Sequence, residues 1–152
     1  MNRQVRIEKF RPEHILQMDL RPSEQERLDA DSKWAEKIEA LANFGMGGAL
    51  IDGDKIVAII GYYEMWTGCF EVWAFPCADI ERHAMLYLRT TKRYIQMIER
   101  THDPRRLQTT SFADPLHDRW MRFLGFECET PNGMRNYSIL GQTFNLWSKV
   151  YE

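Results

Sequence analysis

Apolar residues gather in three neighbouring stretches in the middle of the chain. Ala49–Ile51 and Ile56–Tyr63 flank Asp52-Gly53-Asp54, a turn sequence whose glycine can adopt a positive φ. Trp66-Thr67-Gly68 forms a second turn and leads into Cys69–Phe75, which ends before a proline that cannot donate a ladder hydrogen bond. Turns this short predict three successive antiparallel strands.

The segment before these strands predicts helices. Apolar residues recur there at helical spacing, at positions Trp34, Ile38 and Leu41. Asp31 and Ser32 are suitable N-caps for this helix, and Gly45 is a suitable C-terminal cap. Pro12–Met18 is predicted as a shorter helix with proline in its first turn, whereas the polar Arg21–Asp31 is expected to be irregular or loosely helical.

The second half of the chain predicts two further helices separated by a strand. Asp79 can cap a long amphipathic helix that reaches about Arg100, and Arg106–Ser111 follows as a strand. Asp114-Pro115 combines an N-cap with proline at the first helical position, and the helix that it begins ends at Gly125. Further strands are predicted at Val5–Glu8, Phe126–Glu129, Tyr137–Leu140 and Phe144–Val150.

This order of elements predicts an α/β (α+β) fold in one domain over residues 1–152. A strand–helix–strand–helix passage after an antiparallel meander produces a mixed, mostly antiparallel sheet with helices on both faces. We expect the long helix over residues 79–100 to pack on one face of that sheet. The helix over residues 114–124 is expected on the other face.

Composition and charge narrow the classes of function. The net charge is −2, which argues against a nucleic-acid binder, although residues 79–122 carry nine basic and six acidic side chains and so a local charge of +3. The three cysteines lack C-x-x-C spacing and the four histidines lack a metal-binding pattern, so no metal site is expected. The longest apolar run, Ile56–Tyr63, is too short to span a membrane, and the polar Met1–Phe10 does not read as a signal peptide. The expected location is the cytoplasm.

Two local stretches in this order of elements carry a resemblance to a known family. Val72-Trp73-Ala74-Phe75-Pro76 resembles the fourth strand of the GNAT superfamily of acyl-CoA N-acyltransferases, an alternating apolar run that ends at proline. Asp114–Phe126 resembles the last helix of that family, which ends in Leu-Gly-Phe, as Leu124-Gly125-Phe126 does here. The resemblance covers roughly residues 47–130 and extends to the C-terminal strands.

The resemblance implies acetyl-CoA as cofactor and an amine or protein as the acyl acceptor. It implies that the backbone of Trp73, Ala74 and Phe75 holds the pantetheine, and that Arg82 and His83 meet the pyrophosphate. Glu71, or Glu64 on the preceding strand, would be the general base that accepts the proton of the amine. A solvated strand carboxylate is the alternative interpretation of either glutamate.

The chain departs from the family pattern at two places. The signature Q/R-x-x-G-x-G/A reads Asp79-Ile80-Glu81-Arg82-His83-Ala84 here, so only Ala84 matches, and Asp79 as an N-cap would occupy the backbone N–H groups meant for phosphate. Met121 stands where many members have the tyrosine that protonates the leaving thiolate, and a thioether donates no proton.

These departures leave an alternative open: a catalytically inactive GNAT-fold binding or structural module with a protein partner. Small phage-encoded GNAT-like proteins, including internal virion proteins, are similar in length and also lack the glycine signature. That narrower likeness implies the host cytoplasm or the virion as the location. The sequence alone does not distinguish the active enzyme from the inactive module.

Overall fold

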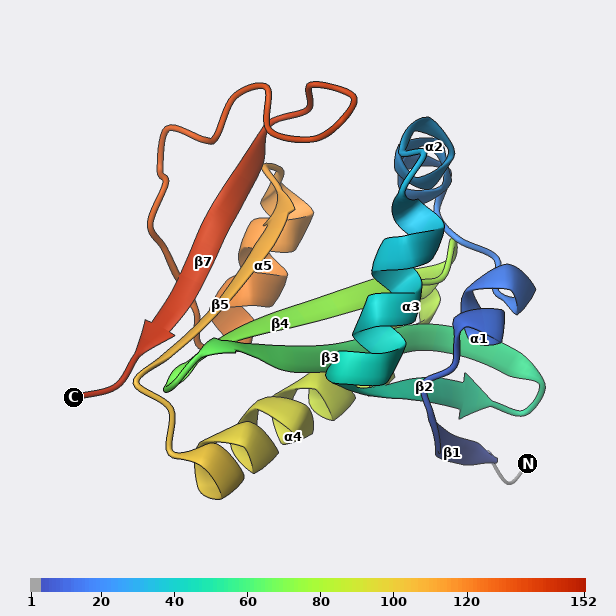
Figure 1. The fold of residues 1–152 in the computed structure, drawn as a ribbon, viewed down its shortest axis with the longest axis horizontal. Helices are drawn as coiled ribbons and strands as arrows, with labels where there is room; N and C mark the ends of the chain where they lie inside the picture. The colour runs from blue at the N-terminus through green and yellow to red at the C-terminus, as the bar shows by residue number, and fades with distance from the viewer. Residues whose placement is uncertain (1–3) are drawn as a thin grey trace. The chain divides into compact units, whose positions relative to one another are not determined.

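The computed structural model describes residues 4–152 and contains one seven-stranded sheet with the strand order β1-β2-β3-β4-β5-β7-β6. The predicted α/β class, with a mixed and mostly antiparallel sheet and helices, is confirmed (Figure 1). The strands are β1 Val5–Lys9, β2 Met46–Asp52, β3 Lys55–Trp66, β4 Cys69–Pro76, β5 Arg106–Phe112, β6 Glu127–Cys128 and β7 Phe144–Val150. The helices are α1 Pro12–Gln17, α2 Pro22–Ala30, α3 Trp34–Phe44, the 3-10 helix η1 Ile80–His83, α4 Ala84–His102 and α5 Pro115–Phe123.

The chain divides into two compact units. The first contains Met1–Tyr63 and Trp73–Tyr87, and the second contains Glu64–Val72 and Leu88–Glu152. Three elements, β3, β4 and α4, each run from one unit into the other. The single domain over residues 1–152 stays a prediction.

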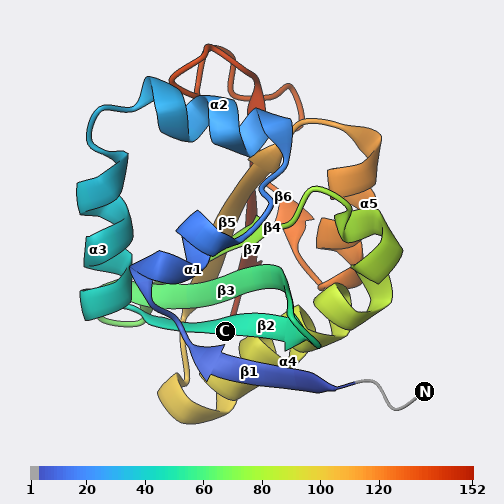
Figure 2. The same ribbon diagram turned by 90° about the vertical axis from the view of Figure 1, so that its right-hand side faces the viewer.

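In the first unit, β2 pairs with β1 on one side and with β3 on the other, both antiparallel (Figure 2). The turn between β2 and β3 uses Gly53 at a φ of 65°, as its sequence predicts. The helix α3 packs on β2 and contacts α1. Buried apolar side chains of this unit include Phe10, Ile15, Ile38, Leu50, Val57 and Ile59.

In the second unit, β5 pairs antiparallel with β7 from Arg106–Val150 to Phe112–Phe144. On its other side β5 pairs in parallel with β4, through Cys69–Arg106, Phe70–Leu107 and Glu71–Gln108. Parallel neighbours require a crossover connection, and α4 provides it. Buried apolar side chains of this unit include Phe70, Ile95, Ile98, Leu107, Phe126 and Trp147.

Four predicted details of the secondary structure and packing differ from the structure. Arg21–Asp31 contains the regular helix α2, which begins with Pro22 at its first position, where its missing N–H costs nothing. Lys33 rather than Asp31 or Ser32 is the N-cap of α3; Asp31 instead accepts the backbone N–H of Lys33. Tyr137–Leu140 forms turns and no strand, because Asn136 and Gly141 take positive φ values and close the loop on itself.

The fourth wrong detail concerns the second unit, where α4 and α5 lie on the same face of the sheet. On β7, Lys149 Nζ lies 3.4 Å from Glu99 Oε2 of α4, and Arg122 of α5 lies 5.5 Å from the ring centre of Trp147. Residues 147 and 149 are two positions apart on one strand and therefore point to the same face. The helix after Asp114 thus packs beside the long helix, not opposite it.

Candidate active site

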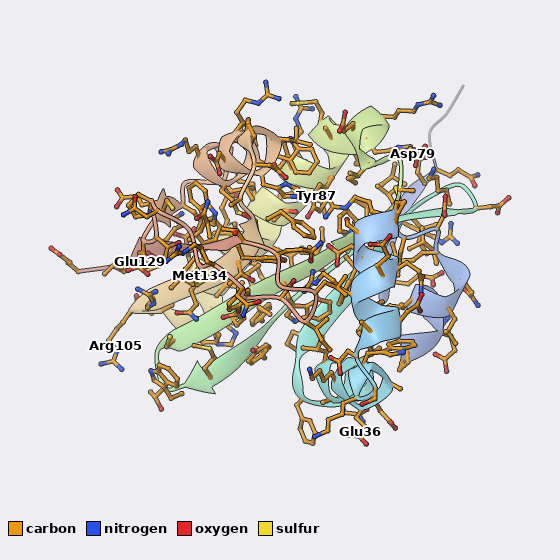
Figure 3. The ribbon with its side chains drawn as sticks, turned by 90° about the horizontal axis from the view of Figure 1, so that it is seen from above. Glu36, Asp79, Tyr87, Arg105, Glu129 and Met134 are labelled. Carbon is orange, nitrogen blue, oxygen red and sulfur yellow. The ribbon has the colours of Figure 1, made fainter. Side chains whose placement is uncertain are left out.

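Glu71 lies on β4 within the parallel ladder to β5. Its Oε2 accepts a hydrogen bond of 3.0 Å from Gln108 Nε2, and Gln108 Oε1 accepts one of 2.9 Å from Arg106 Nε. The Arg106 guanidinium pairs with Glu129, labelled in Figure 3. Burial raises the pKa of Glu71 above its ordinary value, against the opposing effects of Gln108 and Arg106. The arrangement is a half-buried carboxyl group that is held in place and made more basic. By contrast, Glu64 is exposed.

The Trp73 indole lies in a slot formed by two glycines of the first unit. A Cβ built on Gly61 would meet Trp73 Cζ2 at 2.3 Å, and one built on Gly47 would meet Trp73 Cη2 at 3.2 Å. Phe10 meets the ring edge-on at 5.5 Å between centres, and Phe75 lies 5.8 Å from it. Trp73 Nε1 is buried and has no hydrogen-bond partner among residues 4–152.

Asp79 (labelled in Figure 3) does not cap the long helix, which corrects the prediction. Its side chain makes no capping hydrogen bond and instead pairs with Lys55 on β3 and accepts from the Cys77 thiol at 3.3 Å. The Lys55 ammonium is the main reason that the pKa of Asp79 falls to about 2. The charge of Asp79 is therefore balanced within the protein. Its carboxylate does not occupy the N–H groups at the start of the helix.

The other residues of the degenerate signature take different positions. Arg82 and Glu81 are exposed on η1, and Ala84 begins α4. His83 Nε2 lies 3.8 Å from Asp79 Oδ2, and the ring's other nitrogen, Nδ1, is buried without a partner in the described chain. Trp73, Ala74, Phe75, Arg82, His83 and Ala84 all belong to the first unit, whereas Glu71 belongs to the second.

Asp114 caps α5 as predicted, and it also holds a histidine that sequence reasoning did not select. Asp114 Oδ1 accepts the backbone N–H of His117 at 2.8 Å. The two carboxylate oxygens lie 2.7 Å and 2.8 Å from Nδ1 of the same residue. The sequence signal for this contact is the spacing of the two residues, with the aspartate at the N-cap and the histidine at the third helical position. Met121, four residues after His117, is half-buried on the same helix.

Residues 4–152 contain neither a cluster of metal-binding side chains nor a helix that could span a membrane. No set of three or more histidine, cysteine or carboxylate side chains there could hold a metal ion, and Cys69, Cys77 and Cys128 are free thiols. Within the same residues, no helix combines the length and apolar character that crossing a membrane requires.

Solved structures similar to this chain include acetyltransferases. One described as of the GNAT family, from Desulfovibrio desulfuricans, aligns with a TM-score of 0.65 and 11% identity over 97% of this chain and 99% of its own. The ribosomal-protein-S5-alanine acetyltransferase of Vibrio fischeri aligns with a TM-score of 0.67 and 12% identity, covering 99% of this chain and 94% of its own. The chain has the GNAT fold. A mutant of the spermidine N-acetyltransferase of Vibrio cholerae also aligns, with a TM-score of 0.66, 9% identity and coverage of 97% and 95%.

Sequence comparison adds no further relative. No protein-family model matches the chain, and no curated protein sequence matches it. At 9–12% identity, the structural likeness establishes the GNAT fold alone. The chemistry has to be inferred from the residues of the site.

Proposed function

We propose that this GNAT-fold protein is an N-acyltransferase that moves an acyl group from acetyl-CoA to an amine. The proposal rests on the environment of Glu71. A carboxyl group whose pKa is raised by burial, and which is positioned by Gln108 at 3.0 Å, has the properties of a general base.

The residues present fit an anionic acyl carrier in part. Trp73 Nε1 and His83 Nδ1 are buried nitrogens without partners in the described chain, and a bound molecule would supply the partners that they lack. Arg82 offers an exposed guanidinium for phosphate, and Lys55 already balances Asp79. Exposed Glu81 opposes binding of an anion. We therefore assign Arg82 and His83 to the pyrophosphate, and the backbone of Trp73–Phe75 to the pantetheine.

In this mechanism the protein binds, orients and moves a proton. Bound acetyl-CoA would supply the acyl group as a thioester. Glu71 accepts the proton that the amine nitrogen must lose when it attacks. Gln108 fixes the direction of the Glu71 carboxylate, and burial strengthens it as a base because less water competes for its lone pairs.

The acceptor is an amine of a small molecule or of a protein. Similar structures carry names of both classes, spermidine for one and the alanine of ribosomal protein S5 for another. We propose spermidine and a peptide with N-terminal alanine as the first acceptors to test. The cytoplasm stays the predicted location.

The test compares Glu71→Gln with Glu64→Gln. Both remove one carboxylate from neighbouring strands, but only Glu71 is half-buried and bonded to Gln108. Free thiol released from acetyl-CoA is followed in the presence of each amine. Glu71→Gln should lower kcat by about 100-fold or more, in the range of general-base catalysis, and Glu64→Gln should leave it unchanged. Equal rates for both variants and the wild type would exclude Glu71 as the base.

A second candidate function is an inactive module that binds a protein partner, with a phage origin and the host cytoplasm or virion as location. Two observations favour it: Glu81 is exposed on η1, directly before α4, and Met121 cannot donate a proton. Replacing Glu81 by glutamine separates the two functions. In the enzyme the change should strengthen coenzyme A binding severalfold by removing a charge, with Glu36→Gln on α3 as the control. An inactive module would bind coenzyme A in neither form.

A further inference from the structure

The strand β1 is the edge of the sheet in the first unit, and its outer side is unpaired. Figure 2 shows it as the outermost strand, and among residues 4–152 no strand or isolated bridge pairs with that side. Proteins usually block such an edge with a proline, a bulge or charged side chains. The strand reads Val5-Arg6-Ile7-Glu8-Lys9, and its register with β2 is unbroken over its full length. The backbone of β1 is therefore a regular edge that a further strand can join.

The hydrogen bonds at the two ends of β1 show which of its backbone groups face outward. Phe10 N–H donates to the Gly47 carbonyl at 3.0 Å, and Gly53 N–H donates to the Gln4 carbonyl at 2.8 Å. Bonded positions alternate along an antiparallel strand, so the even-numbered residues of β1 bond to β2. The N–H and C=O groups that point to the open edge belong to the odd-numbered residues, Val5, Ile7 and Lys9.

The strand carries apolar side chains on one face and two opposite charges on the other. Val5 is 40% exposed and Ile7 is 54% exposed, and the two side chains share one face because they are two positions apart. Arg6 and Glu8 share the opposite face, where Arg6 Nε donates to Glu8 Oε1 at 3.2 Å. Each of these two charged side chains makes one further contact within the first unit. The charges are thus held in place along the open edge.

We infer that β1 is a dimerisation edge, which pairs antiparallel with β1 of a second copy of this chain. A two-fold axis at Ile7 places the two Ile7 residues opposite each other and places Arg6 of each copy opposite Glu8 of the other. The two Ile7 residues then exchange their outward hydrogen bonds, and Val5 does the same with Lys9. An axis at Arg6 or Glu8 would bring like charges together, and an axis at either end would pair fewer residues. The order of charges along β1 therefore selects the axis at Ile7.

Main-chain and side-chain contacts both favour this pairing. The outward backbone groups of β1 gain partners, and each Arg6 and Glu8 gains an opposite charge across the interface. The two Ile7 side chains meet at the axis, and the methylene chain of each Lys9 covers the Val5 opposite it. The ladder is short, so the dimer is reversible and forms as the concentration of the chain rises. It does not depend on the proposed acyl transfer.

Charge reversal tests this register in the untagged full chain. Sedimentation velocity from micromolar to millimolar concentration should show a monomer–dimer equilibrium for the wild type. Arg6→Glu and Glu8→Arg each place like charges opposite each other and should each weaken dimerisation by about 10-fold or more. An equimolar mixture of these two variants should form a heterodimer at least as tightly as the wild type dimerises, because every acid then faces a base. A monomeric wild type at millimolar concentration, or a mixture no tighter than its two components, overturns the inference.

A second comparison uses two exposed isoleucines. Ile7→Asp places two carboxylates at the two-fold axis and should abolish the dimer. Ile139→Asp makes the same change at a residue of the second unit that is 56% exposed, and should leave dimerisation unchanged. The melting temperature of each variant shows that it is folded, and the mixture above remains decisive if Ile7→Asp is not. Dimerisation that survives Ile7→Asp in a folded protein would place the interface elsewhere and overturn the inference.

Discussion

Replacing Gly61 by alanine tests whether the Trp73 ring occupies the slot between β2 and β3. The added Cβ would lie 2.3 Å from Trp73 Cζ2, 2.7 Å from Trp73 Cε2 and 2.7 Å from the Met46 carbonyl oxygen. All three distances are shorter than side-chain contacts allow, so the ring and the backbone of β2 must shift. The structure therefore predicts that a single methyl group at this position is destabilising.

The magnitude follows from the cost of overpacking. Inserting a methyl group into a packed interior costs about 1–3 kcal/mol, and the upper part of this range applies because one obstacle is backbone. For a chain of this size, that loss lowers the melting temperature by about 3–10 °C. Gly47→Ala is the matched control, since its Cβ would meet Phe10 and Trp73 at 3.2 Å and small adjustments would accommodate it.

Urea unfolding of four proteins measures the effect: the wild type, Gly61→Ala, Trp73→Phe and the double variant. Phenylalanine lacks the second ring that contains Cζ2, so Gly61→Ala should cost less in the Trp73→Phe background, by about 1 kcal/mol or more. Additive free energies of unfolding would refute the packing of the indole against Gly61. Equal losses for Gly61→Ala and Gly47→Ala would refute the ranking of the two contacts.

Two further predictions concern polar groups. The pKa of Asp79 is lowered to about 2 from its ordinary value of 3.8, so its ion pair with Lys55 stabilises the fold at pH values above about 4. This stabilisation is lost as the pH falls from about 4 to 2. The free energy of unfolding, measured across this pH range, should show the loss in the wild type and less of it in Asp79→Asn. The buried Trp147 Nε1 donates to the Ser111 hydroxyl at 3.0 Å, and Ser111→Ala removes this acceptor. The free energy of unfolding in urea should fall by about 1–3 kcal/mol. A fall below about 0.5 kcal/mol would contradict the importance of this hydrogen bond.

Local signals explain which elements were predictable from sequence. The turn at Gly53 and the start of α5 at Asp114-Pro115 depend on single residues with strong conformational preferences, and both are confirmed. The same reasoning failed at Tyr137–Leu140. The segment is rich in apolar residues, as strands are, but turns at Asn136 and Gly141 leave it without a neighbouring strand.

The errors at the site come from contacts between residues distant in sequence. Asp79 has the local environment of an N-cap, and nothing near it in sequence indicates that Lys55 lies within reach of its carboxylate. The same holds for Glu71, whose partner Gln108 arrives through the crossover that α4 makes. Likewise, the position of the Trp73 ring depends on Gly61, which lies on another strand. Spacing along the chain predicts candidates, but their partners depend on the sheet.

Binding of acetyl-CoA to the wild-type chain tests the central claim most directly. Isothermal titration calorimetry at up to millimolar ligand, with a parallel measurement of the melting temperature, requires no knowledge of the acceptor. The proposed acyltransferase predicts saturable heat with one molecule bound per chain and a rise in melting temperature as the ligand binds the folded state. The absence of both heat and a thermal shift at millimolar acetyl-CoA would contradict the account and leave the GNAT fold serving as a binding module.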